Sequence, residues 1–293
     1  MLHLSIMKNV PLTFTLVCLL SGAASATAQG RFANVTIKAT HVEGNVHMLE
    51  GAGGNIGVSV GPDGTLIVDT QFAPLAAKIG KALTGLSKGE LRYVLNTHWH
   101  GDHTGGNATL GKKADIIAHA NVRKRLSAAR KPASSLPIIT YDEGLTIHFN
   151  GEEIRLLHLG PGHTDGDSVV WFTKSKVIHL GDHFFVDRFP YIDLGSGGSV
   201  EGYLKNIGRL LEEIPDDHKI IPGHGPLATK DDLKTFHAML VETIGLVRKG
   251  IGEGKTVNQL KAAGMPANYK TWGSGFINTD RWIDIVYGGL ASN

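Results

Sequence analysis

The chain has 293 residues, of which 42% are hydrophobic and 19% are charged, and its formal net charge at pH 7 is +2. This composition is that of a globular protein with enough apolar residues to bury a sizeable core. The nearly balanced charge gives no reason to expect a nucleic acid or an anionic membrane as a partner. The 38 glycines and the aromatic content of only 7% indicate many tight turns, as in a sheet-rich protein with short connections.

Residues 1–28 have the features of an export signal. A positive charge at Lys8 is followed by an apolar run and then by the small-residue cleavage sequence Ala-Thr-Ala. The apolar run is shorter than the ~20 residues that span a bilayer, so we expect no membrane segment in the mature chain. We predict an exported protein, periplasmic or secreted, whose mature chain is a single domain over residues 29–293. The only cysteine, Cys18, lies in the signal, so we expect neither a disulfide nor a thiolate nucleophile in the mature chain.

Strand-like and helix-like patterns alternate along the rest of the chain. In chain order, we predict strands within residues 35–70, a helix at 71–86, strands at 91–97 and 114–119, a helix at 120–129, strands at 145–149, 152–160, 167–173 and 176–184, a helix at 200–214, a strand and turn at 218–225, and helices at 230–249, 256–263 and 279–290. No Pro/Gly/Ser-rich linker and no internal repeat separates two halves. This order favours one domain with two sheets that are covered by helices on their outer faces.

The sequence THWHGDHTGG, at the end of the strand predicted at 91–97, places three histidines and an aspartate within six positions. If the chain stays extended beyond the strand, the alternation of side chains puts His98 and His100 on the same side, where two imidazoles can bind one metal ion. After a turn at the glycine, Asp102 and His103 can address a second ion nearby. This spacing differs from the helical H-E-x-x-H arrangement, in which the two histidines are one helical turn apart.

Four residues do not complete two metal sites, so further ligands are expected downstream. Three glycine-bounded loops that follow predicted strands each contain a candidate, namely His163 in GPGHTDGD, Asp182 in LGDHF and His224 in IPGHGP. All three can meet at one edge of the sheets. A single histidine elsewhere is more often a surface or core residue, and His183, beside Asp182, is expected to support the ligands.

With these motifs in this order, the sequence resembles the metallo-β-lactamase superfamily. The H-x-H-x-D-H motif of the family corresponds to residues 98–103, and its later histidine, aspartate and final histidine match His163, Asp182 and His224. The resemblance extends over about residues 41–247. It implies an α/β fold, the αββα sandwich, in which two sheets lie face to face and the metal ions bind at one edge.

Carried over by position, the ligand roles of the family imply two zinc ions. The first ion would be bound by His98, His100 and His163, the second by Asp102, His103 and His224, and both by a bridging Asp182. Imidazole and carboxylate groups are suitable zinc ligands. The family also has an aspartate that matches Asp69 in LIVDT, and this residue is expected either to orient the metal-binding loop or to cap a turn.

The resemblance implies a dinuclear zinc hydrolase that attacks a carbonyl group with a metal-bound hydroxide, because zinc lowers the pKa of bound water from 15.7 towards about 7. Asp102 would orient this nucleophile as well as bind metal. The small-molecule substrate expected first is a β-lactam, which is a cyclic amide. Hydrolysis of a lactone, ester or thioester by the same metal core is the alternative. A non-hydrolytic iron or zinc protein is the alternative from another class.

Two departures from the family bear on the substrate. Cysteine-containing β-lactamases have a cysteine where this chain has Asp182, and the lysine three residues later, which binds the β-lactam carboxylate, is Phe185 here. The bridging aspartate and His103 instead resemble the thioesterase and lactonase branches, although the glutathione-binding basic residues of the thioesterases are not evident. Aromatic residues that could contact a substrate, or simply pack in the core, are Trp99, Phe184, Phe185, Phe189 and Tyr191.

Overall fold

The structure is a computed structural model that describes residues 30–291. The predicted export signal over residues 1–28 lies outside the described residues. The chain divides into a short N-terminal unit that ends at Asn34 and one compact unit that begins at Val35. Both sheets and all of the candidate ligands belong to the second unit. Within residues 30–291, none of the helices combines the length and the apolar character that crossing a bilayer requires.

The first sheet has seven strands, which pair in the order of the chain. They are β1 (Lys38–Glu43), β2 (Val46–Glu50), β3 (Ile56–Gly61), β4 (Gly64–Val68), β5 (Leu91–Asn96), β6 (Asp115–His119) and β7 (Ile139–Tyr141). The pairs from β1 to β4 are antiparallel, whereas the pairs from β4 to β7 are parallel. The loops after β4, β5 and β6 therefore leave the sheet at the same edge, where ligands of parallel sheets bind.

The second sheet has five strands in the order β12-β11-β10-β9-β8. They are β8 (Gly144–Phe149), β9 (Glu152–Leu157), β10 (Val169–Phe172), β11 (Val177–Phe185) and β12 (Lys219–His224). Only β11 and β12 are parallel; the other pairs are antiparallel. Every residue of β11 is buried, because the strand is covered on both faces.

Helices connect and cover these strands. The α-helices are α2 (Ala76–Leu86), α3 (Gly101–Thr104), α4 (Asn107–Leu110), α5 (Ala120–Ala128), α6 (Val200–Glu213), α7 (Lys230–Gly252), α8 (Val257–Ala263) and α9 (Thr279–Ala291). The 3-10 helices are η1 (Ala73–Leu75), η2 (Ala133–Ser135), η3 (Leu194–Ser196) and η4 (Ala267–Ser274). Capping boxes begin α7 and α8, which fixes the start of both helices.

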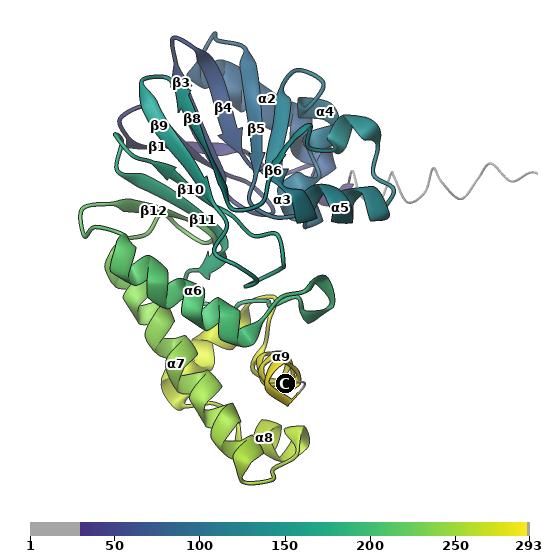
Figure 1. Cartoon of the computed structure of the whole chain (residues 1–293), viewed down its shortest axis with the longest axis vertical. Helices are drawn as coiled ribbons and strands as arrows, with labels where there is room; N and C mark the ends of the chain where they lie inside the picture. Colours follow the sequence, from purple (N-terminus) through teal and green to yellow (C-terminus); the bar gives the residue numbers. More distant parts are fainter. Residues whose placement is uncertain (1–29, 292–293) are drawn as a thin grey trace, which may run out of the picture. The chain divides into compact units, whose positions relative to one another are not determined.

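The two sheets lie face to face, and the helices lie outside them (Figure 1). Buried side chains of both sheets form the layer between them, including Met48 and Leu95 from the first sheet and Ile154 and Phe172 from the second. A second apolar layer joins β11 to α6, α7 and α9, with Trp282 fully buried in it. The predicted αββα sandwich is confirmed.

Several predicted bounds of helices and strands differ from those in the structure. The helix predicted at 71–86 begins as the 3-10 helix η1, which has a proline in its first turn. The strand predicted at 91–97 ends at Asn96, because the Thr97 backbone N–H donates to Asp69 Oδ1 at 2.8 Å and leaves the ladder. The three residues of β7 were not predicted as a strand, since Ile139–Tyr141 is short and mostly exposed and shows no buried face.

Candidate metal centre

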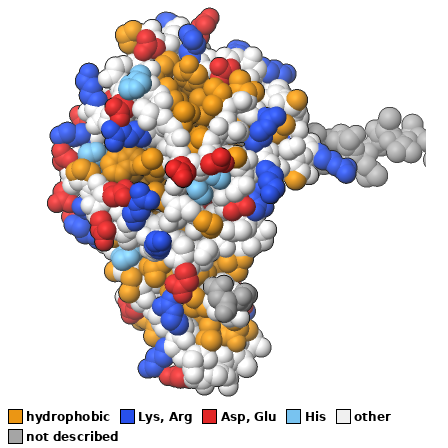
Figure 2. Space-filling view, viewed as in Figure 1, with side chains coloured by type: hydrophobic (Ala, Val, Ile, Leu, Met, Phe, Trp, Pro, Cys, Tyr) orange, Lys and Arg blue, Asp and Glu red, His pale blue; other side chains and the backbone are white. Residues whose placement is uncertain are grey.

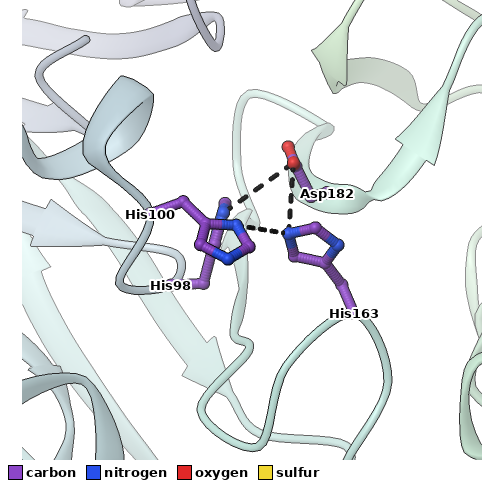
Figure 3. A group of neighbouring side chains, drawn as sticks. All are labelled: His98, His100, His163 and Asp182. Atoms are coloured by element: carbon purple, nitrogen blue, oxygen red, sulfur yellow. Dashed lines mark hydrogen bonds and ion pairs between the residues drawn. The ribbon is translucent and has the colours of Figure 1, made fainter. Parts of the chain in front are cut away.

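Seven ligand-type side chains that are distant in sequence lie together where the two sheets meet. One group consists of His98, His100, His163 and Asp182, the other of Asp102, His103 and His224, and in each group the possible ligand atoms lie within 4.8 Å of one another. Figure 3 shows the first group, in which Asp182 faces the rings of His98 and His163. The structure therefore brings together all seven candidates in the two predicted sets, while their binding of metal stays a prediction.

The first sheet positions four of these side chains. His98 and His100 lie in the loop after β5, so the extended strand assumed for their alternation is wrong, yet both rings reach the same group. The one-turn helix α3 then carries Asp102 and His103 towards the second group. A close approach supports this turn, because a Cβ placed on Gly54 would lie only 2.1 Å from His103 Cε1.

The second sheet and its connecting loop position the other three. His163 lies in the loop between β9 and β10, and His224 ends β12. Asp182 lies inside β11, where the pairing of β11 with β12 shifts register, and Tyr203 holds its backbone oxygen with a hydrogen bond of 2.9 Å. Gly223 is required beside it, since an added Cβ would lie 2.1 Å from Asp182 Oδ1.

The Asp182 carboxylate faces both groups. Its Oδ2 lies 3.4 Å from Nε2 of His163 and 3.8 Å from Nε2 of His98. Its Oδ1 lies 3.1 Å from Nε2 of His103 and 3.5 Å from Nε2 of His224. Each oxygen thus points to a different group, which is the arrangement that a bridging carboxylate needs.

Asp69 fixes the loop that follows β5. Its fully buried carboxylate accepts hydrogen bonds from the backbone and the hydroxyl of Thr97, at 2.8 and 2.7 Å, and lies 2.7 Å from His103 Nδ1. The Nε2 atom of His103 is therefore left to face the second group. Of the two roles that the sequence left open, orientation of the metal loop is the one that this geometry supports.

Sequence reasoning missed two further contacts that orient imidazoles. Asp193 Oδ2 lies 2.9 Å from His100 Nε2, which directs Nδ1 of that ring into the first group. The backbone oxygen of Tyr191 lies 2.6 Å from His163 Nδ1, which directs Nε2 the same way. Asp193 stands 93 residues from His100 in a loop with no ligand pattern, so only the fold reveals this pair.

Burial keeps the imidazoles of His98 and His163 in the first group neutral. Burial and the neighbouring His103 hold the pKa of His98 well below its usual range. Burial also lowers the pKa of His163 to about 4, despite the opposing charge of Asp182. Neutral imidazoles offer lone pairs, so these rings are in the form that binds a metal ion.

Carboxylates dominate the second group. Burial acts to lower the pKa of His224, but Asp182 and a hydrogen bond with Asp102 outweigh it and raise that pKa to about 9. Burial acts to raise the pKa of Asp102, but His103 and His224 outweigh it and lower that pKa to about 2. Metal binding here must therefore release protons from the imidazoles.

The residues present fit a pair of zinc ions. Among the described residues, two buried atoms of the centre have no hydrogen-bond partner, namely His98 Nε2 in the first group and Asp182 Oδ1, which faces the second group. Buried polar atoms are rarely left without a partner unless an ion or water completes them. The donors are imidazoles and carboxylates, with three residues for each ion and one carboxylate between them, which suits zinc.

The predicted aromatic neighbours divide into site and core. Phe185 stacks on His224 with ring centroids 5.2 Å apart, Tyr191 lies 5.9 Å from His163, and Trp99 lies 5.2 Å from His100. Phe184 and Phe189 are buried in the core beside the second sheet, so they do not line the site.

His183 is not among the candidate ligands. Its ring stacks on Tyr203 of α6, with centroids 6.1 Å apart, and its Nε2 lies 3.4 Å from Asn206 Nδ2. It therefore joins β11 to α6, beside the strand that carries Asp182.

Comparisons with known proteins give the family. The model of the metallo-beta-lactamase superfamily matches residues 49–224, which include all seven candidate ligands. The chain belongs to the metallo-beta-lactamase superfamily. Members of this superfamily are mostly metal-dependent hydrolases.

Two curated relatives of the superfamily have different activities. The chain is 26% identical over 128 residues to the metallo-beta-lactamase type 2 of Bacteroides fragilis, a match that covers 44% of this chain and 51% of that protein. It is 30% identical over 139 residues to the hydroxyacylglutathione hydrolase of Methylococcus capsulatus, a match that covers 46% of this chain and 48% of that protein. The chain thus spans about half the length of the curated relatives it matches.

Solved structures share the fold. The DIM-1 metallo-beta-lactamase superimposes with a TM-score of 0.62 at 22% identity, over 71% of this chain and 98% of that one. The metallo-beta-lactamase from Pontibacter korlensis superimposes with a TM-score of 0.61 at 18% identity, over 70% of this chain and 99% of that one. At this identity the likeness establishes the architecture of the superfamily member and leaves its substrate open.

The close approach of Gly54 to His103 leads to a first prediction. In Gly54→Ala the new methyl group would displace the His103 ring, so we expect affinity for the second zinc to fall about 10- to 100-fold, as when a supporting contact is lost. Zinc content at defined free zinc concentrations measures this. Gly80→Ala is the control, because nothing lies within 4 Å of its added Cβ. Equal zinc affinity in all three proteins would contradict the contact.

A second prediction concerns Asp182. We expect Asp182→Ala to lose mainly the second metal ion. We also expect kcat/KM to fall by more than the roughly 100-fold that is typical when a residue that only holds a ligand in place is lost. Metal analysis and the melting temperature are measured together, so that unfolding is distinguished from loss of metal. The control is Asp217→Ala, which removes an exposed carboxylate paired with Lys176. Unchanged metal content would exclude the bridging role.

Proposed function

We propose that this protein is an exported dinuclear zinc hydrolase that cleaves a carbonyl compound, with a β-lactam as the first candidate substrate. The observation that carries the proposal is the Asp182 carboxylate, whose two oxygens face two separate sets of ligands. Two bound zinc ions would lower the pKa of a water molecule towards about 7 and polarise a carbonyl group. The match to the metallo-beta-lactamase type 2 of Bacteroides fragilis supports the choice of substrate.

Asp102 has the position of a group that orients water. Its side chain is 26% exposed, in contrast to the buried Asp182, so a substrate can reach it. Its Oδ2 lies 3.3 Å from His224 Nε2 and 3.6 Å from His103 Nε2. The lowered pKa of Asp102 keeps this oxygen ionised and able to accept a hydrogen bond from water.

Hydrolysis of a lactone, ester or thioester is the second candidate. It is favoured by the bridging aspartate itself, which stands where the cysteine-containing β-lactamases have a cysteine. The match at 30% identity to the hydroxyacylglutathione hydrolase of Methylococcus capsulatus also supports it. The metal core would serve either reaction, so the choice depends on side chains around it.

The two candidates differ in their expected turnover. The purified protein, with its metal content measured, is assayed with nitrocefin, a panel of lactones and a thioester. We expect two zinc ions per chain and nitrocefin turnover that a chelator abolishes and added zinc restores. Turnover of lactone or thioester without nitrocefin would establish the second candidate. Bound iron with no hydrolysis of any substrate would exclude both.

Export is tested separately. In a bacterial host we expect the full chain to appear in the periplasm or the medium with Gln29 as its first residue, because the small-residue sequence before it is a cleavage site. Mass spectrometry of the fractionated protein measures its N-terminus. A chain that starts at Gln29 is the control and should remain in the cytoplasm. Full-length protein that stays uncleaved in the cytoplasm would refute the signal.

A further inference from the structure

An arginine of the last helix lies beside the metal centre. Arg281, in the first turn of α9, has its guanidinium carbon 4.7 Å from the centre of the Phe276 ring and 5.5 Å from the centre of the Tyr191 ring. The two rings themselves meet edge to face, with centroids 6.3 Å apart. Two aromatic contacts restrict a side chain that would otherwise move freely, and they leave the N–H edges of the guanidinium available.

Tyr191 connects this arginine to the candidate zinc ligands. The Tyr191 ring lies 5.9 Å from both His100 and His163, centroid to centroid. Its backbone oxygen also accepts from His163 Nδ1, so the backbone of Tyr191 is fixed beside that imidazole. The charge of Arg281 is therefore held one aromatic ring away from the first metal group.

The charge of Arg281 is not neutralised by an acid. Within residues 30–291, Arg281 forms no ion pair, whereas Lys261 pairs with Asp284 of the same helix at 2.6 Å and Arg125 pairs with Asp165 at 2.7 Å. Asp193, two residues after Tyr191, is held by His100 and by the backbone of Ser196. An exposed cation without a partner can bind an anionic group of a substrate.

Selectivity for an anionic substrate here requires a particular cation rather than a general charge of the surface. Basic and acidic side chains are intermingled over the face shown in Figure 2, so no broad positive field would gather anions there. On β11 the side chain that stacks on His224 is the apolar Phe185. A cation on another element can contact an anionic substrate instead, and α9 presents Arg281 beside Tyr191.

We propose that Arg281 is a specificity-determining residue that binds a carboxylate of the substrate while the carbonyl to be cleaved lies at the metal centre. The inference rests on the proposed hydrolase function and defines its substrate class as an acyl compound that carries a carboxylate. Phe276 and Tyr191 act as positioning residues, since they hold the guanidinium in place. Phe276 is 76% exposed, an unusual state for a phenylalanine that the arginine contact explains.

The test compares substrates that differ only in this charge. Nitrocefin is compared with its neutral carboxamide, and 3-acetoxybenzoate with 3-acetoxybenzamide, using wild type, Arg281→Ala and Arg281→Lys in the zinc-loaded form. We expect wild type to prefer the carboxylates by about 10-fold in kcat/KM, mainly through KM, as for a charge-assisted hydrogen bond at an exposed site. Arg281→Ala should remove this preference and leave the neutral substrates within about two-fold. Arg281→Lys should retain part of it, because the charge remains and the planar stack is lost.

Arg209→Ala is the matched control, because it removes one exposed arginine that pairs with Glu213 on α6 and changes net charge equally. It should retain the preference for carboxylates. A preference that persists in Arg281→Ala, or an equal loss for charged and neutral substrates, would overturn the assignment.

A binding measurement separates this inference from the proposed function. Saturation-transfer NMR with N-acetyl-phenylalanine and its amide reports binding whether or not a substrate is hydrolysed. Binding of the acid alone, lost in Arg281→Ala, supports the subsite even if none of the assays detects hydrolysis, in which case only the proposed function falls. Hydrolysis combined with equal binding of acid and amide by wild type refutes the subsite and leaves the function intact.

Discussion

A buried carboxylate, that of Asp69, is the constraint on which the centre depends. Asp69 follows β4 and has no access to solvent, so its charge must be satisfied by hydrogen bonds within the protein. Thr97, directly after β5, supplies two of them, and the His103 ring is the third partner. The chain must leave the sheet at Thr97 as a result, and the histidines that follow it enter the site. The contact that joins the ends of two neighbouring strands therefore also positions the candidate ligands.

The arrangement of the centre follows from a balance of charge in a dry environment. On one side of Asp182 the imidazoles of His98 and His163 are neutral, whereas on the other side Asp182 and Asp102 stabilise the cationic forms of His103 and His224. The same carboxylate therefore faces lone pairs in one direction and protons in the other. An ion that binds in the second group would displace protons from His103 and His224, which makes the two positions chemically unequal.

Much of this could be predicted from the sequence, because ligand chemistry and strand periodicity are local signals. The His98–His103 motif and the loops of His163, Asp182 and His224 were recognisable from residue type and flanking glycines, and the structure brings them together. The Asp193–His100 contact and the position of Arg281 beside Tyr191 could not be predicted. They join elements far apart in sequence through single ordinary residues, and no periodicity marks such a meeting. The assumption of an extended chain at His98 failed for the same reason, since Asp69 ends the strand.

Each of the two groups combines side chains from both sheets. His98, His100, Asp102 and His103 follow the first sheet, whereas Asp182 and His224 are part of the second. Metal ions bound between them would connect the two sheets at the edge of the sandwich, where the apolar layer ends. Without the ions, we expect that edge to have the lowest local stability. The sheets would separate there first, and the backbone amides there would be the first to exchange with solvent. Metal supply would in this way govern the lifetime of the folded protein as well as its chemistry.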